Sequence, residues 1–196
     1  SPARGATLEP MTRAHILAVL LLLAALAAGS AAPAAQDDPR LEALFRELRT
    51  TDSTIAAANA EREIWSIWLE VAEPAAARAT ARGVRYLQLA RLDAADAAFT
   101  RAIAAAPDFA EAWNKRATVR FLKGDDAGSL ADIRRTLALE PRHFGALAGR
   151  AMIHERRDQP ARALEAYEAA LAVNPHLDRV RARVRALRRE LEGAPI

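Results

Sequence analysis

One pattern occurs three times in this chain, as GVRYLQLARLDAADAAFTRAIAAAP at residues 83–107, ATVRFLKGDDAGSLADIRRTLALEP at residues 117–141 and AMIHERRDQPARALEAYEAALAVNP at residues 151–175. Each copy runs from a small residue through a bulky apolar residue to a proline, and successive copies are 34 residues apart. The positions in phase are Gly83, Ala95, Phe99, Ala102 and Pro107; Ala117, Ser129, Ile133, Thr136 and Pro141; and Ala151, Ala163, Tyr167, Ala170 and Pro175. Alanine is common throughout, so the prolines and the large apolar residues carry the comparison. A period of this length predicts a stack of repeated supersecondary units.

Each unit is predicted to be a helical hairpin. A small residue such as Gly83 lets one helix approach its neighbour closely, and the bulky residue of the same copy fills the space to the following helix. Proline cannot continue a helix interior, so each one marks a boundary between units. One such hairpin cannot bury its apolar stripe alone, and stacking on its neighbours supplies the missing surface. The sequence therefore predicts an all-α solenoid.

The composition agrees with this prediction and excludes several classes of protein. Of the 196 residues 52% are apolar but only 5% aromatic, and glycine and proline together number 18, which favours close-packed helices over a β-sandwich or barrel. The charge is nearly balanced, with 28 basic and 25 acidic side chains, which argues against a dedicated nucleic-acid-binding protein. Because the chain has no cysteine, disulfides, thiolate metal sites and a cysteine nucleophile are excluded.

Residues 76–175 resemble the tetratricopeptide-repeat family, whose unit is a 34-residue helix–turn–helix with this spacing of small residues, aromatic residue and proline. Trp113 and Tyr86 also stand where the family favours tryptophan and tyrosine. The departures are Ser129 and Thr136 for alanine, Arg120 for tyrosine, and Arg82, Arg116 and Arg150 at a position that the family more often fills with leucine. The resemblance implies a right-handed α–α superhelix with repeats at residues 76–109, 110–143 and 144–177.

Helical patterns also flank the repeats. Residues 39–74 are predicted to form a degenerate helical hairpin that caps the N-terminal end of the stack, and residues 178–192 a C-terminal capping helix. Solenoids need such caps to shield the open face of the last repeat. Trp65 and Trp68 are three residues apart and share one helix face, either as core of the cap or as an exposed docking surface. We favour the core, since large aromatic side chains are usually buried.

The N-terminal region predicts export. Arg13 and His15 precede the apolar run ILAVLLLLAALAA at residues 16–28, and small residues follow it. This order is typical of a secretory signal peptide, here residues 11–35, and the run is shorter than the roughly 20 residues that span a bilayer. Residues 1–10 are expected to be a disordered leader or an over-long start. The predicted location is the periplasm of a bacterium, and the alternative is an uncleaved anchor in the inner membrane that faces the periplasm.

No motif for catalysis is present. The sequence lacks an HExxH motif, a nucleophile elbow and a glycine-rich phosphate loop. His143 and His176 follow repeat prolines, where packing at a helix start or solvent exposure accounts for them. We therefore predict a protein that is not an enzyme and that needs no metal or cofactor.

The resemblance places a candidate binding surface on the first helices of the repeats, which line a concave groove in the family. The positions that face this groove are Thr80, Val84, Leu87, Asn114, Lys115, Thr118, Phe121, Leu122, Met152, Glu155 and Arg156. The family's carboxylate clamp for C-terminal tails is incomplete here. Thr80 and Val84 stand where its first lysine and asparagine would be, and Gly145 and Gly149 replace its later basic residues. An apolar peptide or helix is therefore the expected ligand, and the alternative is a shallow, merely solvated surface.

The predicted function is that of an exported scaffold or adaptor that binds a protein or peptide in its groove. A second hypothesis is a non-catalytic accessory subunit of an enzyme or assembly complex in the cell envelope. Contact with a membrane is expected only through the signal peptide or an uncleaved anchor. The sequence does not predict the partner, the pathway or the oligomeric state.

Overall fold

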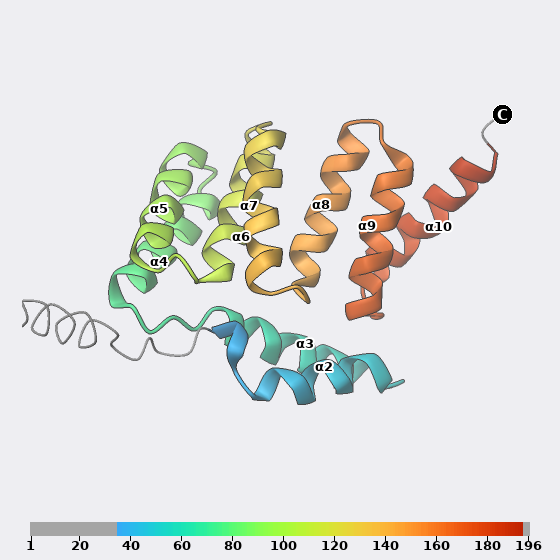
Figure 1. The fold of residues 1–196 in the computed structure, drawn as a ribbon, viewed down its shortest axis with the longest axis horizontal. Coiled ribbons are helices and arrows are strands. Elements are labelled where there is room, and N and C mark those ends of the chain that lie inside the picture. Colours follow the sequence, from blue (N-terminus) through green and yellow to red (C-terminus); the bar gives the residue numbers. More distant parts are fainter. Residues whose placement is uncertain (1–34, 194–196) are drawn as a thin grey trace, which may run out of the picture. The chain divides into compact units, whose positions relative to one another are not determined.

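The computed structural model describes residues 35–193, in which helices alternate with short loops (Figure 1). After a short 3₁₀ helix, η1 (Ala35–Asp37), the elements are α2 (Arg40–Thr50), α3 (Thr54–Trp68), α4 (Pro74–Gln88), α5 (Leu92–Ala105), α6 (Ala110–Leu122), α7 (Asp126–Leu139), α8 (Phe144–Arg156), α9 (Pro160–Val173) and α10 (Asp178–Glu192). No strand occurs in this range, and the all-α prediction is confirmed. None of the described helices is both long and apolar enough to cross a membrane.

The predicted leader (residues 1–10) lies outside the described residues. So does the predicted signal peptide (residues 11–35), apart from its last residue.

Six helices form three hairpins, in which α4 pairs with α5, α6 with α7 and α8 with α9. Consecutive hairpins meet where α5 packs on α6 and α7 packs on α8, so the units build a helical-hairpin superhelix, as predicted. α10 packs against α9 and buries Val184 and Leu187. Each hairpin is followed by a loop that contains one proline of the pattern, and these loops are residues 106–109, 140–143 and 174–177. We call these three loops the loop edge.

Small residues face bulky ones inside each hairpin. A Cβ on Gly83 would lie only 2.6 Å from Cε1 of Phe99, so glycine is required where α4 crosses α5. The same pairing recurs in the buried clusters of the other two repeats, as Ala117 with Ile133 and Ala151 with Tyr167. The pattern that defines the repeats is thus a packing pattern.

The turn inside each hairpin contains one residue with left-handed backbone geometry. The φ angle is +54° at Ala90, +82° at Gly124 and +54° at Asp158, and these three positions are in phase. A side chain destabilises this conformation because Cβ crowds the following carbonyl oxygen. Only the second repeat has the residue that adopts it without strain.

Ala90→Gly is expected to raise the free energy of unfolding by up to about 1 kcal/mol. Glycine relieves roughly 1–2 kcal/mol of backbone strain. Part of this stabilisation is lost, because glycine raises the conformational entropy of the unfolded chain. Ala90 is exposed, so the change removes no core contact. Gly124→Ala makes the reverse change at the equivalent turn and should destabilise the protein by a similar amount. Urea unfolding of both variants measures these effects, and a loss of stability in Ala90→Gly would contradict the prediction.

α2 and α3 form a further hairpin, which we call the N-terminal hairpin. Its core includes Phe144 at the start of α8 and packs against Val173 and Leu177. The core residues of the hairpin itself are Leu41, Phe45, Leu48, Ala57, Ala60, Ile64, Ile67 and Trp68. No comparable packing joins the hairpin to α4 among the described elements. The prediction that residues 39–74 cap the N-terminal end of the stack is therefore wrong in position, because the hairpin packs across the loop edge instead.

Polar contacts join η1 and the N-terminal hairpin to each of the three loops of the loop edge. Gln36 of η1 donates a hydrogen bond to the carbonyl oxygen of Asp108 at 2.9 Å. In the second loop, the Arg142 guanidinium forms an ion pair with Glu42 at 2.7 Å and lies 4.4 Å from the centre of the Phe45 ring. In the third loop, the side-chain amide of Asn174 donates to Glu61 at 3.0 Å.

Both tryptophans of α3 face this interface. Trp68 is 2% exposed, and its ring is stacked on the His143 imidazole with centroids 4.2 Å apart. Trp65 is half-buried and meets His143 and Phe144 edge to face, at 5.5 and 5.3 Å. Of the two interpretations that the sequence leaves open, the structure therefore shows the core.

Candidate functional site

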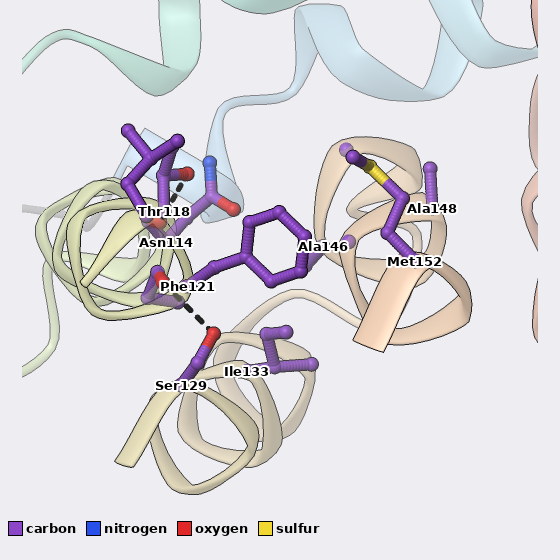
Figure 2. Close-up of a pocket in the computed structure, with 12 residues that line it drawn as sticks. Asn114, Thr118, Phe121, Ser129, Ile133, Ala146, Ala148 and Met152 are labelled. Atoms are coloured by element: carbon purple, nitrogen blue, oxygen red, sulfur yellow. Dashed lines mark hydrogen bonds between the residues drawn. The ribbon is translucent and has the colours of Figure 1, made fainter. Parts of the chain in front are cut away.

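A pocket of about 250 Å³ lies between α6, α7 and α8, and we call it the groove pocket. Figure 2 shows the Phe121 ring extending from α6 toward α8, with side chains of α7 beside it. The pocket is lined by Asn114, Ala117, Thr118, Phe121, Leu122, Ser129, Ile133, Gly145, Ala146, Ala148, Gly149 and Met152. Most of these are small or apolar, and the pocket can therefore bury apolar groups.

The two hydroxyl groups at the pocket are bonded to the backbone of α6. Thr118 Oγ1 donates to the carbonyl oxygen of Asn114 at 3.1 Å, and Ser129 Oγ donates to that of Ala117 at 2.8 Å (Figure 2). Their protons are thus not free to orient a polar ligand. The second bond also ties α7 to α6 inside the hairpin.

Two glycines on α8 leave the space open. A Cβ on Gly149 would meet only Ile133 Cδ1, at 3.7 Å, so its absence enlarges the pocket. A Cβ on Gly145 would lie 2.8 Å from the Trp65 ring, so this glycine is needed for α3 to approach α8. From the sequence alone, both glycines are identified only as missing clamp residues. Two glycines four apart in one helix are the signal that could have indicated an open face.

A buried polar network supports the wall formed by α6. Ala146 N–H donates to His143 Nδ1 at 3.1 Å, so the imidazole caps α8 and carries its proton on Nε2. That Nε2–H donates to Glu111 at 2.9 Å, and Asn114 donates to the same carboxylate at 2.8 Å. The Lys115 ammonium completes the set at 2.8 Å. Burial raises the pKa of the Glu111 carboxyl, but the hydrogen bond from His143 and the charge of Lys115 outweigh it and hold the pKa below its ordinary value.

The ends of the groove pocket are also fixed. The Arg156 guanidinium lies 3.8 Å from the centre of the Phe121 ring, donates to the Phe121 carbonyl oxygen at 2.8 Å and pairs with Asp126. This holds Phe121 in place at the end where α8 finishes. At the other end Trp65 abuts Gly145.

Five of the eleven predicted groove residues line the pocket, namely Asn114, Thr118, Phe121, Leu122 and Met152. Arg156 and Lys115 border it without lining it, and the Lys115 ammonium lies 5.6 Å from the centre of the Trp65 ring. The structure does not bring Val84 and Leu87 to it, because they pack near Phe99 in a cluster of the first repeat. Thr80 is buried on α4, and Glu155 is taken up by hydrogen bonds to α9 and α10.

The acid–base pair of the buried network is closed off from any ligand. His143 and Glu111 pair at 2.9 Å, but both side chains are fully buried, so a substrate has no access to them. Within residues 35–193 no group of three histidine, aspartate or glutamate side chains is placed to hold a metal ion.

Known proteins similar to this chain share its repeats. A TPR repeat-containing protein of Rhizobium etli is 32% identical over 154 residues, which are 79% of this chain and 76% of the relative. Tetratricopeptide repeat protein 36 of Mus musculus is 43% identical over 58 residues, which are 30% and 31% of the two chains. No protein-family model matches the sequence.

Solved structures show the same fold at lower identity. The first TPR domain of Spaghetti, bound to an HSP90 peptide, has a TM-score of 0.59 at 20% identity and covers 63% of this chain and 98% of that one. The TPR2B domain of yeast Sti1, in complex with pHsp70, has a TM-score of 0.55 at 20% identity, over 59% and 97% of the two chains. MamA has a TM-score of 0.57 at 15% identity, over 83% and 87%.

Proposed function

The chain belongs to the tetratricopeptide-repeat family, and on that premise we propose that it is a non-catalytic scaffold that binds a peptide or partner helix in the groove pocket. The observation that carries the proposal is the apolar pocket between α6, α7 and α8, whose walls are held by the Glu111–His143 network and by the Arg156–Phe121 contact. A preformed surface loses little conformational entropy on binding, which favours affinity. The Spaghetti and Sti1 domains, which share the fold, are bound to a peptide and to pHsp70 respectively.

The chemistry of the pocket favours an apolar ligand side chain. Lys115 is the basic residue that the sequence predicts to face the groove from α6, and its ammonium pairs with Glu111. Gly145 and Gly149 contribute no functional group. A volume of about 250 Å³ is smaller than the roughly 300–1,000 Å³ of typical small-molecule sites. It therefore suits one or two side chains of a larger partner.

The setting that we propose is the bacterial periplasm, either as a free protein or anchored in the inner membrane. This rests on the positive residues and the apolar run that precede residue 29. In that setting the scaffold could also serve as an accessory subunit of an envelope enzyme or assembly complex.

Met152→Glu is expected to weaken peptide binding at least tenfold. Met152 lines the pocket and is 46% exposed, so a charge there is tolerated in the free protein but must be desolvated when a ligand covers it. Ile55→Glu is the matched control, because Ile55 is 73% exposed on α3 and does not line the pocket. A displayed library of random peptides, selected on the full chain, supplies the probe, and fluorescence anisotropy measures its affinity for each variant.

A selected peptide that loses affinity in Met152→Glu and keeps it in Ile55→Glu supports the proposal. Equal affinity for all three proteins, or a library that yields no binder, counts against binding in the groove pocket.

A further inference from the structure

The second repeat contains a carboxylate held by two basic side chains. Asp132 on α7 is 1% exposed and accepts two hydrogen bonds from Arg116 of α6, each at 2.8 Å. Arg120, one turn later on α6, approaches the same carboxylate at 3.1 Å. The third guanidinium nitrogen of Arg116, Nη1, donates to Thr100 Oγ1 on α5 at 3.0 Å. The carboxylate is thus the centre of a satisfied charged site inside this repeat.

The third repeat keeps the basic residues but has lost the carboxylate. The residues 34 positions after Arg116 and Arg120 are Arg150 and His154 on α8. The residue 34 positions after Asp132 is Ala166, which is 2% exposed on α9. The equivalent of Thr100 is Arg134, so that acceptor is missing as well.

A cavity of about 290 Å³ lies at this position, and we call it the arginine pocket. It is lined by Arg150, His154, Arg162, Glu165 and Ala166. The ion pairs among residues 35–193 involve neither Arg150 nor Arg162. His154 Nδ1 bonds to the Gln159 side-chain oxygen at 2.8 Å, so the ring is oriented by its own loop.

The charges around the arginine pocket favour an anion. The pocket is lined by two guanidinium groups but by one carboxylate, that of Glu165. Glu165 forms no ion pair within the described residues. The first repeat lacks such a pair of basic residues, because Tyr86 takes the second position and Arg82 is exposed. Among the three repeats, the third therefore combines two basic residues on its first helix with no carboxylate at the facing position.

We propose that the arginine pocket binds a carboxylate from another molecule, in the place that Asp132 fills in the second repeat. A guanidinium offers two parallel N–H donors that match the two oxygens of a carboxylate, and such charge-assisted pairs are strong. The volume admits a carboxylate on a short carbon chain, either a small organic acid or the acidic side chain of a peptide. The site is distinct from the groove pocket in its residues and in its chemistry.

Titration calorimetry of the full chain, in low salt without organic acids, tests the proposal with three probes. These are succinate, a blocked tetrapeptide with two central glutamates, and inorganic phosphate. We expect saturable binding of succinate or of the peptide, and the tighter of the two identifies the source of the carboxylate. No binding of either, or tighter binding of phosphate at the same residues, overturns the proposal.

Two variants assign the binding to this pocket. Arg150→Leu introduces the residue usual at this position of the family and is expected to weaken carboxylate binding at least tenfold. Ala166→Asp supplies the carboxylate from within the chain, as Asp132 does. It should abolish binding and raise the melting temperature by about 2–4 °C, a shift of the size expected for one such interaction in a chain of this length.

The matched control is Arg101→Leu, which removes an exposed arginine of α5 that does not line the arginine pocket. It should leave the affinity within twofold of the native value. Glu165→Gln removes the competing carboxylate and should tighten binding. Affinity that is unchanged in both Arg150→Leu and Ala166→Asp overturns the proposal, and because Ala166→Asp is expected to stabilise the fold, it remains informative if Arg150→Leu fails to fold.

Discussion

Trp68→Ala is expected to release the N-terminal hairpin from the loop edge and to lower the free energy of unfolding by about 3–5 kcal/mol, the usual cost of truncating a buried tryptophan. Trp68 is stacked on His143 with the ring planes 9° apart, and it also contacts Phe45 and Phe144, at 6.0 and 5.1 Å between centroids. It thus joins α2, α3 and α8 at one point. Removing it leaves a cavity that the remaining side chains of a two-helix hairpin cannot close.

Hydrogen exchange together with urea unfolding measures this effect. Amides of α2 and α3 should lose protection in Trp68→Ala, whereas those of α6 to α9 should keep most of theirs. Trp68→Phe is the conservative control. The indole N–H of Trp68 has no acceptor among the described residues, so phenylalanine keeps the stacking and loses no hydrogen bond. Full protection of α2 and α3 in Trp68→Ala would show that the hairpin is held by other contacts.

The N-terminal hairpin also shows how far the sequence determines the fold. The helices themselves follow from the local pattern, and the spacing of Trp65 and Trp68 predicts that they share one face. The surface that covers this face does not follow, because His143 and Phe144 lie about 75 residues further along the chain. The expectation of a cap rests on what a solenoid end needs, and packing on the loop edge overrides it.

The residues of the groove pocket can likewise be predicted only in part from the sequence. The 34-residue register predicts that Asn114, Phe121 and Met152 face one groove, and the structure places all three at the groove pocket. The structure places Val84 and Leu87 elsewhere, since they pack in the same cluster as Phe99. Register gives the face of a helix on which a residue lies, but not which of its neighbours covers that face.

The polar residues of the interior are the least predictable. The sequence marks Arg116 and His143 as departures or as helix-start residues, without a partner for either. The structure supplies the partners as Asp132, which lies on the opposite helix of the same hairpin, and Glu111, which lies 32 residues before His143 on α6. A charged residue forms a buried ion pair only when the fold places a residue of opposite charge beside it.

Asp132→Ala is expected to lower the free energy of unfolding by about 3–5 kcal/mol, because removing one partner leaves a buried charge uncompensated. Arg116 is 9% exposed and has Asp132 as its carboxylate partner, which raises the pKa of its guanidinium further above the usual range. Arg120 is less dependent on Asp132, since it also approaches Asp96 at 3.5 Å. Most of the cost therefore comes from Arg116.

The double variant Arg116→Leu with Asp132→Ala should recover most of this loss. Leucine is the family's usual residue at position 116, and replacing a buried ion pair by apolar side chains is often neutral or stabilising. Urea unfolding of the native protein, both single variants and the double variant gives the coupling energy between the two residues. If the double variant is instead as unstable as the sum of the single variants, the penalty in Asp132→Ala arises from the cavity and not from the unpaired arginine. The third repeat already contains the combination that Asp132→Ala creates, since Arg150 and Ala166 occupy the equivalent positions. There the guanidinium is only half-buried and lines the arginine pocket. This favours the unpaired, buried Arg116 as the source of the penalty in Asp132→Ala.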